Sequence, residues 1–127
     1  MRRHCACLNP TVLVVDDDYR TRMTLADLLA EEGYAVATAI DGQRALAFLQ
    51  QRHACFVLLD LMMPTQSGLQ TLAELTNSPT MPRVPVGVIS ALVTETPLGT
   101  VGVLHRPLDL DGLLSLVHEH AGPPQAY

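Results

Sequence analysis

Short apolar runs that end in polar residues alternate along this chain with segments of helical spacing. Five such runs read as strands, namely Thr11 to Val15, Tyr34 to Ala39, Cys55 to Leu59, Val84 to Ile89 and Val101 to Leu104. Apolar residues with helical spacing follow the first, second, third and fifth runs, and the last of these segments covers Leu108 to His120. This alternation predicts right-handed crossovers and one parallel sheet with helices on both faces.

Carboxylates follow two of the predicted strands. Asp16 and Asp17 come directly after the first run, and Asp60 ends the third. Because the carboxyl ends of parallel strands meet at one edge of a sheet, we expect these three side chains to share a cleft. Like charges a few ångströms apart repel by several kcal/mol at an effective dielectric of about 20, so the cluster requires a cation. Mg²⁺ suits it, since this ion takes one or two carboxylates and leaves another free to attack phosphorus.

Helix capping is the alternative explanation for the acidic triplet Asp16, Asp17 and Asp18. An aspartate at the start of a helix is stabilising because it accepts from backbone N–H groups. Capping explains Asp18 well, but it does not explain Asp60.

With these motifs in view, the sequence resembles the receiver domain of bacterial response regulators, from about Thr11 to Leu116. The resemblance is carried by Val12 to Asp18, Leu58 to Pro64 with Gly68, Ile89 to Ala91, and Arg106 with Pro107. It implies a flavodoxin-like, doubly wound α/β fold with a five-stranded parallel sheet in the order 2-1-3-4-5. We expect a receiver domain over residues 11–120, with an N-terminal tail at 1–10 and a C-terminal tail at 121–127.

The resemblance also implies roles for individual residues. Asp60 is expected to be the phosphoacceptor, beside Mg²⁺ or Mn²⁺ held by Asp16, Asp17, Asp60 itself and the backbone carbonyl of Met62. Ser90 is expected to bond a phosphoryl oxygen, and Arg106 to supply the cation of the site. The implied chemistry is limited to self-phosphorylation and self-dephosphorylation, so we do not expect an enzyme.

The implied function is that of a stand-alone phosphoacceptor response regulator in two-component signal transduction. The expected phosphodonor is a sensor histidine kinase or a phosphotransfer protein, and output is expected through contacts with a downstream protein that the sequence does not identify. A monomer or a weak dimer is expected.

Three departures from the family's pattern favour a second hypothesis. Arg106 stands where the family has Lys, Val103 stands where it has an aromatic residue, and the segment 91–105 is shorter than usual and contains Pro97. The fourth helix of the family is therefore expected to be shortened or absent, since an interior Pro costs about 3 kcal/mol. These departures are compatible with a phosphorylation-independent pseudo-receiver that acts as an interaction module.

A phosphatase is a third reading. Asp16 and Asp18 after a strand are similar to the motif of haloacid-dehalogenase-like phosphatases. Arg20 stands where that family has Thr or Val, and the chain leaves no room for a cap domain. The receiver reading therefore explains more of the sequence.

Charge and composition argue against nucleic-acid binding, membrane insertion and secretion. The net charge of -5 argues against direct binding to nucleic acid, which needs a basic surface. No apolar run reaches the roughly 20 residues of a membrane span, and no signal peptide is recognisable. Three cysteines cannot all pair, and Cys55 lies among apolar residues, so we expect reduced thiols and a cytoplasmic location.

Overall fold

The structure is a computed structural model, and it describes residues 10–61, 68–79, 83–90, 99–105 and 108–124. Five strands are present in these ranges: β1 (Thr11–Val15), β2 (Ala35–Ala39), β3 (Phe56–Asp60), β4 (Val86–Ser90) and β5 (Gly102–His105). Four helices accompany them: α1 (Tyr19–Glu31), α2 (Gly42–Gln51), α3 (Gly68–Asn77) and α4 (Leu110–Ala121).

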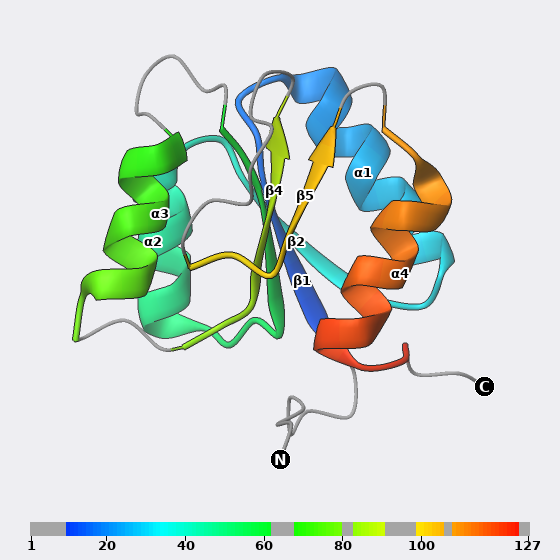
Figure 1. The fold of residues 1–127 in the computed structure, drawn as a ribbon. Coiled ribbons are helices and arrows are strands. Elements are labelled where there is room, and N and C mark those ends of the chain that lie inside the picture. The colour runs from blue at the N-terminus through cyan, green and yellow to red at the C-terminus, as the bar shows by residue number, and fades with distance from the viewer. Residues whose placement is uncertain (1–9, 62–67, 80–82, 91–98, 106–107, 125–127) are drawn as a thin grey trace.

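All five strands are parallel and lie in the order β2-β1-β3-β4-β5. Helices α1 and α4 cover one face of the sheet, and α2 and α3 cover the other (Figure 1). The predicted doubly wound α/β fold and its strand order are therefore confirmed. The expectation of a shortened or absent fourth helix falls largely on residues 91–98, which lie outside the described residues, and Gly99 to Val101 are not helical.

The two faces of the sheet bury two separate sets of apolar side chains. Along β1, Val12 and Val14 pack toward α1 and α4, whereas Leu13 and Val15 pack toward α2 and α3. This alternation follows from the period of two residues in a strand. Because β1 and β3 are covered on both sides, they read as continuous apolar runs.

Aspartate side chains begin three of the four helices in the described part of the chain. Asp18, Asp41 and Asp109 are the N-caps of α1, α2 and α4, and each accepts a hydrogen bond from a backbone N–H three residues later. Asp18 accepts from the N–H of Thr21 at 2.9 Å and also from its hydroxyl at 2.7 Å. The capping explanation is thus correct for Asp18, and it fixes where α1 starts beside the acidic loop.

Cys55 corrects one expectation. It is buried immediately before β3 and is disulfide-bonded. The prediction of a reduced thiol at this position is therefore wrong: burial among apolar neighbours does not by itself keep a thiol from pairing.

Among the helices that the structure describes, none is both long and apolar enough to cross a membrane.

Candidate phosphoacceptor site

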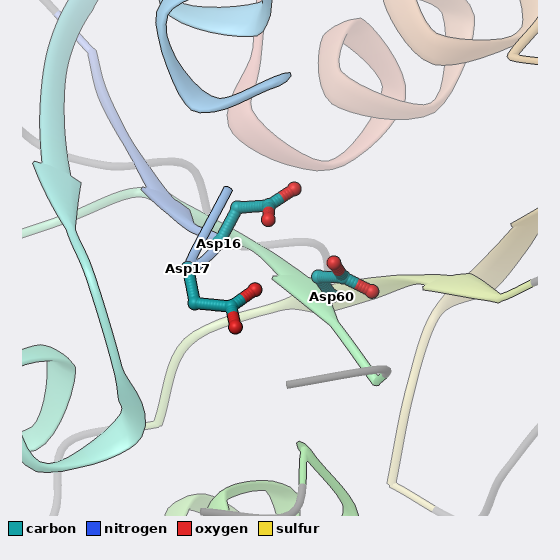
Figure 2. Close-up of side chains that lie close together, drawn as sticks. All are labelled: Asp16, Asp17 and Asp60. Atoms are coloured by element: carbon teal, nitrogen blue, oxygen red, sulfur yellow. The ribbon is translucent and has the colours of Figure 1, made fainter. Parts of the chain in front are cut away.

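Asp16, Asp17 and Asp60 come together at the carboxyl edge of the sheet. One carboxylate oxygen from each lies within 4.8 Å of the others. Asp16 and Asp60 are 0% and 3% exposed, whereas Asp17 is exposed to solvent. Figure 2 shows the three side chains converging from the ends of two adjacent strands. The predicted cluster is therefore present, with two buried carboxylates and an open side.

The strand register explains why these residues meet. Val15 of β1 lies opposite Leu59 of β3, so Asp16 leaves β1 at the level where Asp60 ends β3. Past this point, the N–H of Leu61 donates to the carbonyl of Ile89 at 3.1 Å, which ties the end of β3 to β4. The sheet therefore places Asp60 directly, and it places Asp16 at the first position after β1.

Hydrogen bonds fix the backbone of Asp16. Its N–H donates to the carbonyl of Ala39 on β2 at 3.1 Å, and its Oδ1 accepts from the N–H of Asp18 at 2.9 Å. Its carbonyl accepts from Nη1 of Arg22 on α1 at 2.9 Å. The contact with Arg22 was missed in the sequence analysis, although an Arg four residues after a capping Asp can reach back over the first helical turn.

Gly68 allows α3 to begin against the strand that carries Asp60. A Cβ at this position would lie 2.4 Å from Cα of Leu61 and 2.7 Å from the backbone oxygen of Asp60. Both atoms belong to the backbone and have little room to move. A glycine is therefore required here by close approach, which the sequence alone did not distinguish from a simple turn.

Ser90 is the last residue of β4 and is 1% exposed. Asp60 lies opposite Ile89, so Ser90 stands one position further along the neighbouring strand. Val103 is half-buried in β5, opposite Val88. The other two predicted site residues, Met62 and Arg106, lie outside the described residues.

The donor set fits a hard divalent cation. Buried carboxylates that crowd together are destabilising unless a cation offsets their charge. Oxygen ligands, with one open side for water or phosphate, match the preference of Mg²⁺. Asp16, Asp17 and Asp60 are the described residues that could hold such an ion.

Comparison with known proteins agrees with this arrangement. The sequence profile of the response regulator receiver domain matches residues 12–118. Protein PilG of Pseudomonas aeruginosa is 34% identical over 115 residues, which cover 86% of this chain and 85% of PilG. Response regulator RR06 of Streptococcus pneumoniae is 42% identical over 85 residues, which cover 67% of this chain but only 38% of that longer protein.

A solved structure gives the same result for the fold. Response regulator TrrA from Thermotoga maritima, in complex with Mg²⁺-BeF, superimposes with a TM-score of 0.77 at 27% identity and covers 87% of this chain and 97% of TrrA. The fold, the acidic site and the profile match define a signalling phosphoacceptor module rather than an enzyme. This chain belongs to the response regulator receiver domain family.

Proposed function

We propose that this protein is a phosphoacceptor response regulator in which Asp60 takes a phosphoryl group from a phosphohistidine. The donor would be a sensor histidine kinase or a phosphotransfer protein, since membership of the receiver family implies such a partner. The observation that carries the proposal is the convergence of three carboxylates within 4.8 Å, two of them buried, at one edge of the sheet.

Asp16, Asp17, Asp60 and the backbone carbonyl of Met62 would hold Mg²⁺ or Mn²⁺. The Mg²⁺-BeF complex of TrrA supports this assignment, because the two chains share the fold at 27% identity. When bound, the ion supplies positive charge that offsets the carboxylates and the phosphoryl oxygens.

The transfer itself is a displacement at phosphorus. A carboxylate oxygen of Asp60 forms the new P–O bond as the P–N bond of the phosphohistidine breaks. The electron pair of the P–N bond stays on that nitrogen, and a proton on the other ring nitrogen makes the leaving imidazole neutral. The Ser90 hydroxyl and the Arg106 guanidinium would donate hydrogen bonds to phosphoryl oxygens. Such hydrogen bonds would stabilise the charge on these oxygens during transfer.

Output would proceed through protein contacts of the receiver domain, which we assign to residues 11–120 between tails at 1–10 and 121–127. The downstream partner is a protein rather than nucleic acid, in keeping with the net charge of -5. We propose a cytoplasmic location, where kinases of this class present their phosphohistidine, and a monomer or weak dimer.

One observation favours a second function. Val103 packs against the core from β5, at a position where the family has an aromatic switch residue. A valine has no ring to move between buried and exposed states, and Arg106 replaces the usual Lys. A pseudo-receiver that binds its partner without phosphorylation is therefore the alternative.

Incubation with acetyl phosphate and Mg²⁺, followed by intact-mass measurement, separates the two functions. We expect the wild type to gain one phosphoryl mass and Asp60→Asn to gain none. Asp109→Asn is the matched control, because Asp109 caps α4 and is not one of the three clustered carboxylates. A folded wild type that gains no mass, and also gains none from a phosphorylated phosphotransfer domain, would favour the pseudo-receiver.

A further inference from the structure

The side chain of Arg22 reaches from the first turn of α1 back to the loop that carries the acidic residues. Its Nη1 donates to the backbone carbonyl of Asp16 at 2.9 Å. Its Cζ lies 5.5 Å from the centroid of the Tyr19 ring, within the range of a cation–π contact. The edge of the guanidinium therefore binds the carbonyl of Asp16, while its face lies over the ring of Tyr19. A planar guanidinium can make both contacts at once, whereas a compact ammonium cannot.

The carbonyl that accepts the bond from Arg22 belongs to the peptide unit between Asp16 and Asp17. The carbonyl of Asp16 and the N–H of Asp17 lie in one rigid plane, so turning this plane swings the Cα of Asp17 and its side chain. The N–H of Asp16 donates to Ala39, and its carboxylate accepts from Asp18. These two bonds fix Asp16, and the bond from Arg22 acts on the peptide plane that follows.

We propose that Arg22 is a positioning residue for the metal site: it fixes the Asp16–Asp17 peptide so that both carboxylates face the same ion. This inference rests on the proposed function, because it presumes that the acidic cluster binds a divalent cation. Asp17 is the exposed member of the cluster, so its direction depends most on the backbone that carries it.

The proposed role of Arg22 predicts the direction in which the affinity for Mg²⁺ changes when this residue is replaced. Arg22 is a cation near a cation site, so its charge alone opposes binding of Mg²⁺, and removing that charge would tighten binding. Loss of positioning has the opposite effect, since groups that orient metal ligands typically contribute about tenfold to hundredfold in affinity. The direction of the change in affinity therefore distinguishes the two effects.

Arg22→Met keeps most of the aliphatic stem and removes both the charge and the donors. We expect calorimetric titration with Mg²⁺ alone to give a Kd about tenfold or more above that of the wild type. The Mg²⁺ concentration that half-saturates phosphorylation by acetyl phosphate should rise by the same factor, while the rate at saturating Mg²⁺ changes by less than about twofold. A merely structural role would lower the maximal rate or the folded fraction instead.

Arg20→Met is the matched control. Arg20 is exposed on the same helical turn, and its side chain makes no hydrogen bond or ion pair with the described residues. This variant therefore loses the same charge without losing the contact. Its Mg²⁺ affinity should be unchanged or slightly higher. Equal Kd shifts in Arg20→Met and Arg22→Met, or tighter binding by Arg22→Met, would overturn the proposal.

Two gentler variants cover the case in which Arg22→Met does not fold. Arg22→Lys keeps the charge but replaces the planar guanidinium with a compact ammonium. Tyr19→Leu removes the ring that contacts the guanidinium, at a residue that is 66% exposed. Each should raise the Kd for Mg²⁺ by about threefold, and wild-type affinity in both would contradict the proposal. If the wild type itself binds no Mg²⁺, the proposed function fails rather than the role of Arg22 within it.

Discussion

The three consecutive aspartates after β1 differ in what their side chains contact. Asp16 is buried and accepts a hydrogen bond from the backbone of its own loop. Asp17 is exposed to solvent and is a member of the carboxylate cluster, whereas Asp18 caps α1. The same residue type therefore has separate effects on metal affinity and on stability at adjacent positions. Substitutions at this scale can separate the two quantities.

Asp17→Asn and Asp18→Asn should have different consequences. We expect Asp17→Asn to weaken Mg²⁺ binding by about tenfold or more, because a charged oxygen ligand is replaced by a neutral one. Asp18→Asn keeps a good N-cap and should change stability little, whereas Asp18→Ala should cost about 1 kcal/mol. Calorimetric titration and urea unfolding measure the two effects. A large loss of Mg²⁺ affinity in Asp18→Asn would contradict this division.

Tyr34 makes the stability of the folded state depend on pH in the alkaline range. Its hydroxyl donates to the carbonyl of Gly122 at 2.9 Å. Burial, and to a lesser extent the charge of Glu32, raise the pKa of the Tyr34 phenol above its ordinary value of 10.0. Since the folded state holds the proton more tightly, the contribution of Tyr34 is complete below about pH 10 and is lost as the pH rises through the raised pKa.

Tyr34→Phe tests this account. The variant should lose about 1 kcal/mol at neutral pH, because the hydrogen bond to Gly122 is absent. Its stability should fall less steeply than that of the wild type above pH 10. Urea unfolding at neutral and alkaline pH measures both, and parallel stability profiles for the two proteins would show that Tyr34 is not responsible.

At the scale of whole elements, apolar periodicity was sufficient to predict the five strands and the helices around them. Boundaries shifted by one or two residues: the fourth run was expected from Val84 and begins at Val86, since Pro85 has no N–H to donate to a ladder. The convergence of Asp16, Asp17 and Asp60 was also predictable, because parallel strands end at one edge. The contacts of Arg22 and the close approach at Gly68 were not, since they depend on how α1 and α3 are placed.

A pair of glycines sets the distance between α4 and the sheet. Gly87 and Gly102 lie opposite each other on β4 and β5, and a Cβ at either would come within 3 Å of the Leu116 side chain. At Gly87, the ring of Phe56 is equally close. This packing could not be predicted from the sequence, because a glycine within a strand has several explanations.

Gly87→Ala should therefore destabilise the protein by roughly 1–3 kcal/mol through overpacking. Leu116→Ala should also destabilise it, because the removed side chain leaves a cavity. In the double variant the new methyl group occupies part of that cavity, so we expect the combined loss to be clearly smaller than the sum. Thermal or urea unfolding of the four proteins measures this, and simple additivity would argue against direct packing of Leu116 on Gly87.

At the scale of the whole molecule, the acidic cluster links metal binding to folding. Mg²⁺ binds carboxylates that only the folded sheet brings together, so the ion should raise the unfolding temperature, by an amount that grows with the logarithm of its concentration. Na⁺ at equal ionic strength should have little effect. In Asp17→Asn the same rise should need about tenfold or more higher Mg²⁺ concentration. An equal rise at the same concentrations in that variant would place the stabilising ion elsewhere on the protein.

The central claim is that Asp60 carries the phosphoryl group, and chemical trapping tests it most directly. Borohydride reduces an aspartyl phosphate to homoserine, which peptide mass spectrometry can locate after incubation of the protein with acetyl phosphate and Mg²⁺. We predict homoserine at position 60, lost in samples prepared without Mg²⁺ or without the phosphodonor. Homoserine at another aspartate, or unmodified Asp60 in protein that has gained a phosphoryl mass, would contradict the assignment.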